Sequence, residues 1–316
     1  MRPSAERFAI ERPSSRPTVG LVIDRMDWHA RELTAALLAR GARVVPVRLP
    51  ACGFATQNAS GLHIDGYGET LPDAVIVRTM SGASFEAVTL RLGILHALRE
   101  LGVMVWNDAR AIERCVDKST TSFLLSRAGI ATPATWATES YEHARAIAQR
   151  ETAQGPLVLK PLFGSQGRGL KLIGGPDDLP YPGTVAGVYY LQRFIGVDRA
   201  GFYDFRLLVL QGHVVAAMQR HSSQWITNVK RGGRPVAAVV NDEMRALAID
   251  AAAVVGADFA GVDILYGADE RPTVLEVNSM PAWSGLQKVT SVNIASAFAE
   301  ALRAALAVHG LRGARA

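Results

Sequence analysis

Two short apolar segments in the last quarter of the chain carry polar residues at their centres, and this pair most constrains the fold. The segments span residues 261–265 (GVDIL) and 274–278 (VLEVN), and a turn rich in Gly, Asp and Pro separates them. We expect two paired β-strands. Because side chains alternate across a strand, Glu276 and Asn278 share one face, and Asp263 on the neighbouring strand can join them.

Three oxygen-bearing side chains on one sheet face are costly to bury unless a positive group lies among them. Mg²⁺ takes few protein carboxylates and completes its coordination with water and substrate phosphates. Asp263, Glu276 and Asn278 therefore predict a magnesium–nucleotide site. The alternative is a strand pair with these residues facing solvent.

Size and composition indicate a globular protein with two or three domain-sized units. The chain has 316 residues, of which 49% are hydrophobic and 20% charged. Cys52 and Cys115 are too few for a disulfide framework, so we expect a cytoplasmic protein. No apolar run approaches the roughly 20 residues that span a bilayer, so we expect no membrane partner.

The net charge of +5 favours anionic partners such as nucleotides or acidic substrates. Nucleic acid is disfavoured, because much of the excess lies in the first 17 residues and no basic run interleaved with aromatic residues follows. We also expect a homo-oligomer.

Strand and helix patterns alternate in the first third of the chain. Strands are predicted at 18–23, 44–47, 74–77 and 103–107, with helices at 28–39 and 85–101. This alternation predicts a parallel, helix-covered sheet with a ligand crevice at the carboxyl ends of its strands. Arg78 lies at one such end and is a candidate substrate residue; the alternative is a surface arginine.

The rest of the chain predicts two further units. Helices are expected at 117–128, 141–150 and 243–255, strands at 157–160, 170–173 and 188–192, and a hairpin of 205–210 with 213–220. The predicted organisation is a disordered leader (1–17), an N-terminal domain (18–110), a central lid (111–192), a C-terminal unit with the metal site (193–308) and a tail (309–316).

A glycine-rich loop connects two of these strands. Gly164, Gly167 and Gly169 allow backbone N–H groups to approach an anion closely, although a flexible hairpin has the same pattern. The loop lacks the Gly-Lys-Ser/Thr ending of a P-loop. Lys160 ends the apolar strand before it and needs an anionic partner, for which phosphate is a candidate; Lys118 could supply a second charge.

Together these features resemble the ATP-grasp superfamily, specifically its RimK-type ATP-dependent glutamate ligases. The resemblance extends over about residues 18–305 and consists of short motifs in a fixed order. They are Asp117-Lys118 and residues 158–160, 164–169, 191–195, 204–206, 214–220, 227–233, 260–263 and 275–278.

The resemblance implies an α/β (α+β) ATP-grasp fold preceded by a Rossmann-like domain, with ATP between two sheets. The implied ATP-binding residues are Lys118 and Lys160 at the phosphates, Gly164, Ser165, Gln166 and Gly167 in the closing loop, Gln192, Arg193, Phe194 and Ile195 at the adenine, and Asp204 at the ribose. Asp263, Glu276 and Asn278 would hold Mg²⁺, or Mn²⁺ in its place.

The resemblance also suggests which residues act on the substrates. Arg220 would neutralise charge during phosphoryl transfer, and Asn228 would orient a substrate or the metal shell. The basic residues Lys230 and Arg231 suit a substrate carboxylate, and a solvated loop is their alternative.

Two positions depart from the family pattern. The family commonly has Gln-Glu-Tyr where this chain has Gln192-Arg193-Phe194. After the metal strand, Ser284 stands where the family has an acid, and Trp283 would offer an aromatic face to the acceptor. A core tryptophan is the alternative for Trp283.

The predicted function is ligation of L-glutamate, or a similar amino acid, to a carboxylate acceptor through an acyl phosphate. The acceptor would be a protein, a peptide or a one-carbon coenzyme of the tetrahydromethanopterin or methanofuran type. The alternatives are an ATP-grasp small-molecule kinase and a non-catalytic ATP-binding regulator. The intact set of Asp263, Glu276 and Asn278 argues against the regulator.

Overall fold

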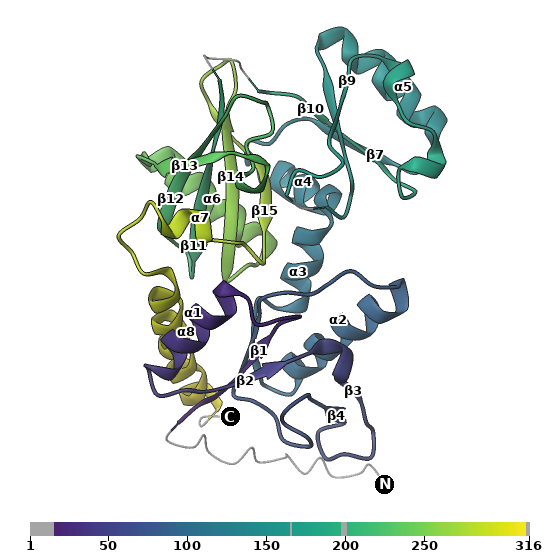
Figure 1. Cartoon of the computed structure of the whole chain (residues 1–316). Coiled ribbons are helices and arrows are strands. Elements are labelled where there is room, and N and C mark those ends of the chain that lie inside the picture. Colours follow the sequence, from purple (N-terminus) through teal and green to yellow (C-terminus); the bar gives the residue numbers. More distant parts are fainter. Residues whose placement is uncertain (1–15, 165, 197–200, 314–316) are drawn as a thin grey trace.

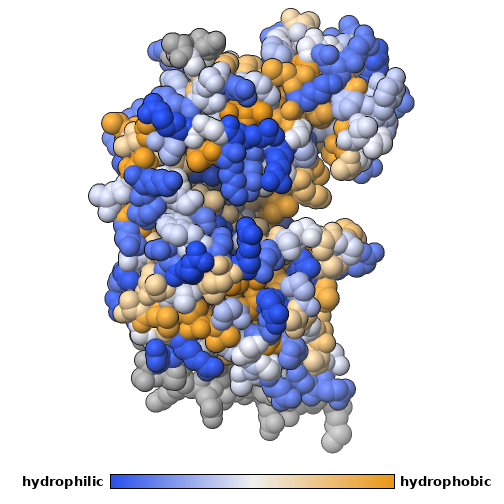
Figure 2. Space-filling view, in the orientation of Figure 1, coloured by the Kyte–Doolittle hydropathy of each residue, from blue (hydrophilic) through white to orange (hydrophobic). Residues whose placement is uncertain are grey.

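Three sheet-bearing units follow one another along the chain (Figure 1). The computed structural model describes residues 16–164, 166–196 and 201–313. In the space-filling view an open notch separates the central unit from the N-terminal unit on the right-hand side (Figure 2). Among the described residues no helix is long and apolar enough to cross a membrane.

The N-terminal unit is the predicted parallel sheet. Its strand order is β2-β1-β5-β6, and every pairing is parallel. The Asp27 carboxylate accepts from the backbone N–H of Ala30 and begins the first helix. The elements are β1 (Thr18–Val22), α1 (Trp28–Leu38), β2 (Arg43–Val47), β5 (Ala74–Val77), α2 (Phe85–Glu100) and β6 (Met104–Trp106), with a side hairpin of β3 (Gly53–Phe54) and β4 (Leu62–His63).

The central unit, which we call the lid, is an antiparallel sheet in the order β7-β10-β8-β9. Helix α5 packs its apolar side, with Ala144 and Ile147, against Leu157 and Leu191 of the sheet. The lid elements are β7 (Thr135–Thr138), α5 (Tyr141–Glu151), β8 (Leu157–Lys160), β9 (Lys171–Ile173) and β10 (Tyr189–Arg193).

The C-terminal unit is a five-stranded antiparallel sheet in the order β13-β12-β11-β14-β15. The predicted hairpin forms β11 and β12, and the acid-bearing segments form β14 and β15. Helix α6 covers the face that carries Leu207, Val262 and Val277, so the polar residues at alternate positions lie on the opposite face. The elements are β11 (Phe202–Leu210), β12 (His213–Ser222), β13 (Arg234–Ala237), α6 (Asp242–Val255), β14 (Phe259–Tyr266) and β15 (Pro272–Asn278).

Two helices join the N-terminal unit to the C-terminal sheet. Helices α3 (Ala109–Val116) and α4 (Lys118–Arg127) both pack against α6 and β15. The domain boundary predicted at residue 111 places these helices with the lid, whereas their contacts place them with the C-terminal sheet. The cause is burial of apolar surface, because Leu125 of α4 is fully buried in the core under that sheet.

The last helix returns to the beginning of the chain. Helix α8 (Ile294–Gly313) packs beside α1, and Phe298 and Leu302 share one core with Leu33 and Trp106 (Figure 1). Helix α8 continues to residue 313, so residues 309–313 of the predicted tail are helical. The predicted leader lies outside the described residues up to residue 15, and Pro17 already accepts a backbone hydrogen bond from Arg43. The remaining short helices are η1 (Leu49–Ala51), η2 (Thr152–Gln154), η3 (Pro176–Asp178), η4 (Pro182–Thr184), η5 (Val229–Arg231) and α7 (Ser284–Gln287).

Candidate functional site

A cleft lies between the lid and the polar face of the C-terminal sheet, and its open space, with the solvent at its mouth included, is about 1190 Å³. It gathers most of the residues that the sequence predicts for nucleotide, metal and catalysis. Its lining includes Lys118, Lys160, Gly164, Gln166, Gly167, Gln192, Arg193, Phe194, Ile195, Asp204, Arg220, Asn228, Asp263 and Glu276. Ser165 lies outside the described residues.

The predicted metal ligands share one sheet face. Asp263 of β14 pairs directly with Glu276 of β15, so their side chains lie on the same side of the sheet. The Asn278 amide donates to Glu276 Oε1 at 3.0 Å. Asp263 is only 4% exposed, so this position does not face solvent, whereas Glu276 and Asn278 are partly buried.

Two arginines engage the Asp263 carboxylate. Arg206 donates to both of its oxygens, each at 2.7 Å, and Arg220 Nη2 lies 3.0 Å from Oδ2. Burial alone would raise the pKa of Asp263, but Arg206 and Arg220 together hold it below its ordinary value. The sequence reading missed Arg206. The sequence does contain a signal for it, because alternation along a strand places residue 206 on the same face as Asp204.

Arg220 is shared between two carboxylates. Its guanidinium donates Nε and Nη2 to Asp204, with the Nε bond at 2.6 Å, and it also contacts Asp263. Burial acts to lower the pKa of Arg220, yet Asp263 and Asp204 keep it above the ordinary arginine value. The arginine predicted for phosphoryl transfer and the acid predicted for ribose are thus ion-paired to each other on the cleft wall.

Two lysines face the same cleft without a carboxylate partner at salt-bridge distance in the described part of the chain. Lys160 Nζ donates to Gln192 Oε1 at 2.5 Å, and Lys118 Nζ donates to the carbonyls of Leu162 and Gly164 at 3.2 and 2.8 Å. Burial lowers the pKa of each lysine, and the charge of Glu276 opposes that shift. Ammonium groups in this state suit an anionic ligand such as phosphate.

Arg193 lines the cleft, but its guanidinium binds within the lid and ties the lid together. Its guanidinium donates to the carbonyls of Glu151 and Gly155, at 2.9 and 2.6 Å, and to the Glu151 carboxylate at 2.8 Å. The departure from the family pattern at this position therefore has a structural explanation. Arg193 anchors the end of β10 to the end of α5.

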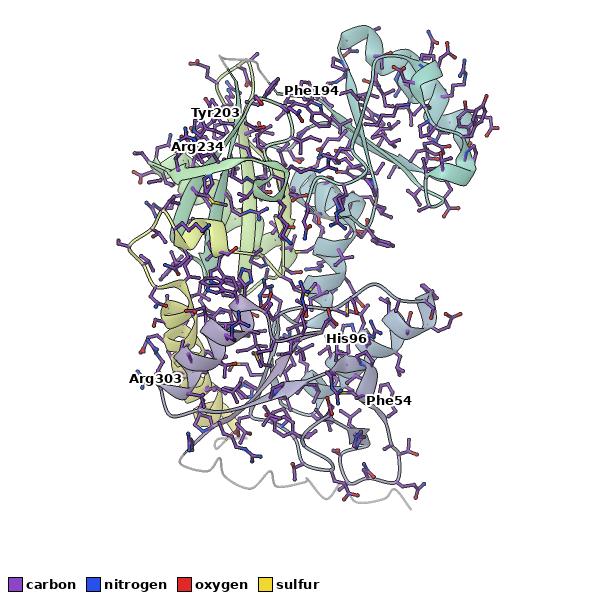
Figure 3. All side chains as sticks on the ribbon, viewed as in Figure 1. Phe54, His96, Phe194, Tyr203, Arg234 and Arg303 are labelled. Atoms are coloured by element: carbon purple, nitrogen blue, oxygen red, sulfur yellow. The ribbon has the colours of Figure 1, made fainter. Side chains whose placement is uncertain are left out.

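Aromatic residues line the end of the cleft where the lid meets the C-terminal sheet. Phe194 meets Trp225 edge to face with ring centroids 5.8 Å apart, and Tyr203 and Tyr266 also line this end. Phe194 and Tyr203 lie at this junction in Figure 3. Flat apolar surfaces of this kind suit a nucleotide base.

The glycine-rich loop is held against the C-terminal unit. Arg231 Nη2 donates to the Gly167 carbonyl at 3.1 Å. Gly167 has a φ of 67°, and a Cβ there would lie 2.7 Å from Ile226 Cγ2. Glycine is thus required both by its backbone conformation and by the close approach of the loop.

Trp283 is not the exposed acceptor residue that the sequence suggests. The ring is fully buried and packs edge to face on His29 and Phe259, with centroids 4.6 and 5.7 Å apart. Its large apolar area joins the N-terminal unit to the C-terminal sheet, so burial is favoured over exposure in a loop. The alternative of a core tryptophan is correct.

Arg78 is also buried, and is neither a surface arginine nor part of the cleft lining. Its Nη1 donates to the Met280 carbonyl at 3.1 Å, and its guanidinium lies 4.9 Å from the centre of the Trp283 ring. Burial lowers the pKa of Arg78 to about 10. At 5% exposure it offers a substrate little surface, and its contacts are those of a residue that supports the domain junction.

The other predicted substrate residues lie on η5. Lys230 and Arg231 are exposed, and the Asn228 side chain accepts from the backbone N–H of Lys230 to begin this short helix. In the N-terminal unit, His29 Nε2 accepts from the backbone N–H groups of Trp283 and Ser284. The sequence reading missed this histidine, because its partners lie more than 250 positions away.

The donor atoms of the site fit magnesium. They are two carboxylates and one amide oxygen, from Asp263, Glu276 and Asn278; no group of three or more His, Cys, Asp or Glu residues gathers anywhere in the described ranges, this site included. Oxygen-only donors in this number suit Mg²⁺ that takes its remaining ligands from water and phosphate.

Comparisons with known proteins agree with this architecture. The model of the RimK-like ATP-grasp domain matches residues 115–302. A tetrahydromethanopterin:α-L-glutamate ligase from Methanosarcina acetivorans is 31% identical over 324 residues, which cover 90% of this chain and 98% of the relative. A probable α-L-glutamate ligase from Teredinibacter turnerae is 33% identical over 283 residues, covering 86% of this chain and 90% of the relative.

Solved structures show the same fold. The ATP-grasp ligase PsnB, in complex with a minimal precursor, Mg and ADP, has a TM-score of 0.69 and 23% identity, and the match covers 91% of this chain and 98% of that chain. The fold and cleft thus define an ATP-grasp protein. The chain belongs to the RimK-like ATP-grasp family and is an ATP-dependent ligase that forms carbon–nitrogen bonds.

Proposed function

We propose that the chain adds L-glutamate to a coenzyme acceptor of the tetrahydromethanopterin type, at the cleft between the lid and the C-terminal sheet. The observation that carries the proposal is the pair of partly buried lysines, Lys118 and Lys160, which line the same cleft as Asp263 and Glu276. This arrangement suits a polyphosphate bound together with a divalent cation. Mg²⁺ would supply charge neutralisation at the phosphates when bound to Asp263, Glu276 and Asn278.

The reaction that we propose has two steps. An acceptor carboxylate oxygen attacks the γ-phosphorus of ATP, which forms an acyl phosphate and releases ADP. The amine of glutamate then attacks the acyl carbon. The bond from this carbon to the bridging phosphate oxygen breaks, phosphate leaves with its electron pair, and the amine loses a proton to give the amide. In-line transfer of this kind mainly requires alignment and charge neutralisation.

The roles of the residues follow from their positions. Lys118 and Lys160 would bind the phosphates, and the loop around Gly167 would cover them. Arg220 lines the cleft beside Asp263 and would stabilise negative charge that develops on the transferred group. Lys230 and Arg231 are exposed beside the cleft residue Asn228 and would attract a substrate carboxylate.

The choice of acceptor rests on the relatives. The Methanosarcina acetivorans protein is named for tetrahydromethanopterin and matches along 98% of its length. A second relative with the same name, from Methanococcus maripaludis, is 35% identical over 199 residues. We further propose that Mn²⁺ can replace Mg²⁺, and that the protein acts in the cytoplasm as a homo-oligomer without a nucleic-acid partner.

The test is a reaction with ATP, Mg²⁺, L-glutamate and tetrahydromethanopterin, analysed by mass spectrometry. The proposal predicts an acceptor that gains glutamate, with ADP release that depends on both glutamate and the acceptor. ADP release that needs the acceptor alone, with a phosphorylated product, would identify a kinase instead. Glu276→Gln is the matched inactive control, because it removes a ligand charge with little change of shape.

A further inference from the structure

The most buried predicted metal ligand is already occupied by protein donors. Asp263 accepts from Arg206 Nε and Nη2, each at 2.7 Å, and Arg220 Nη2 lies 3.0 Å from the same carboxylate. An ionised carboxylate offers about four lone-pair positions. Three of them are therefore directed at guanidinium groups, and little room is left for a metal ion that arrives alone.

Arg206 lies between both acidic ligands. It pairs with Asp263 across β11 and β14, and its Nη2 lies 4.0 Å from Glu276 Oε1. Its side chain is only 11% exposed, so its charge is weakly screened by solvent. A divalent cation at this place would meet a buried positive charge within a few ångströms.

The wider cleft is also positive. Its lining carries more basic than acidic side chains: Lys118, Lys160, Arg168, Arg193 and Arg220 against Asp204, Asp263 and Glu276. Arg193 is neutralised by Glu151, which lies outside the lining, so four basic side chains remain against three acidic ones. Arg206 adds a further cation beside Asp263. Such a surface attracts a polyanion and repels a free cation. Bound phosphates would make the net charge of the cleft negative and so attract a cation.

We propose that Arg206 is the resident counter-ion of Asp263 and makes divalent-cation binding depend on the nucleotide. The inference rests on the proposed function, since it assumes that nucleotide phosphates enter this cleft. Arg206 acts as a positioning residue: its two hydrogen bonds hold the Asp263 carboxylate in place until phosphate charge is present. A cation then binds as part of the metal–nucleotide complex.

The first test uses Mn²⁺ as the probe, with bound ion measured by electron paramagnetic resonance on the intact chain after treatment with EDTA. Wild-type protein should bind Mn²⁺ about tenfold or more tightly with ADP present than without it. Equal Mn²⁺ affinity with and without ADP would overturn the inference and leave the proposed function standing. Failure of ADP to bind at all would instead refute the proposed function.

The second test changes the counter-ion. In Arg206→Gln, Mn²⁺ alone should bind about tenfold more tightly than in wild type, and the effect of ADP should shrink accordingly. Arg206→Lys keeps the charge but not the two parallel bonds, so its Mn²⁺ affinity should lie between the two. Arg145→Gln, which removes an exposed lid arginine paired with Asp177, is the matched control and should behave as wild type.

Melting curves accompany each variant. If Arg206→Gln does not fold, the comparison of wild type with Arg206→Lys decides the question. An Arg206→Lys protein whose Mn²⁺ affinity equals that of wild type, with and without ADP, would then contradict a role for the bidentate contact.

Discussion

Replacement of Trp283 by alanine should destabilise the protein strongly. The ring is fully buried in the core that α1, α8 and β14 share. Truncation of a buried tryptophan costs about 3–5 kcal/mol, because both the apolar burial and the packing around the cavity are lost. For a chain of 316 residues we expect a fall in melting temperature of roughly 5–8 °C.

The matched control is Trp283→Phe. Trp283 Nε1 has no hydrogen-bond partner within the described residues, so phenylalanine removes area but breaks no hydrogen bond. The control should therefore melt well above the alanine variant. Differential scanning calorimetry measures both, and ADP affinity measured well below the transition should be unchanged, because Trp283 does not line the cleft. An alanine variant that melts with the wild type would refute the buried role.

Three further substitutions test separate parts of the account. Lys160→Ala should weaken ATP binding by about tenfold or more while changing the melting temperature little, and unchanged calorimetric affinity would contradict its assignment to the phosphates. Arg193→Gln should lower the free energy of unfolding by about 1.5–3 kcal/mol without a comparable loss of ATP affinity, because its charged bonds go to Glu151 and Gly155; the reverse pattern would show a direct role at the nucleotide. Burial, together with the charge of Arg78, lowers the pKa of His29 in the folded protein. As the pH falls below about 6.5, the unfolded chain therefore protonates this histidine before the folded protein does, and the free energy of unfolding decreases. Urea unfolding of His29→Gln should show a weaker loss between about pH 7.5 and 5.5, and a slope equal to that of wild type would exclude His29 as the cause.

Local sequence patterns were sufficient to predict most of the helices and strands. Strand β1, helix α1 and the hairpin of β11 with β12 are each determined by neighbouring residues, and each forms close to its predicted range. Helix α8 was missed because alanines cover all its sides and leave little periodic contrast. Strand β7 is short and only partly buried, so its pattern is weak too.

The candidate site was predictable where residue type and motif order agree, as at Lys160 and Glu276. It was not predictable where partners come from distant strands. The bidentate contact of Arg206 with Asp263 depends on the register of β11 against β14, and 57 positions separate the two residues. Trp283 was misplaced for a similar reason: no local pattern shows that His29 and Phe259 surround its ring.

The central claim is that a magnesium–nucleotide complex binds between Lys160 and the carboxylates of Asp263 and Glu276. Isothermal titration of ADP, with and without Mg²⁺, tests it most directly in wild type and Glu276→Gln. We expect Mg²⁺ to strengthen ADP binding, and the Mg–ADP complex to raise the melting temperature of the wild type. It also predicts that Glu276→Gln folds normally but loses most of this magnesium dependence. Equal magnesium dependence in both proteins, or no ADP binding by the wild type, would contradict the account.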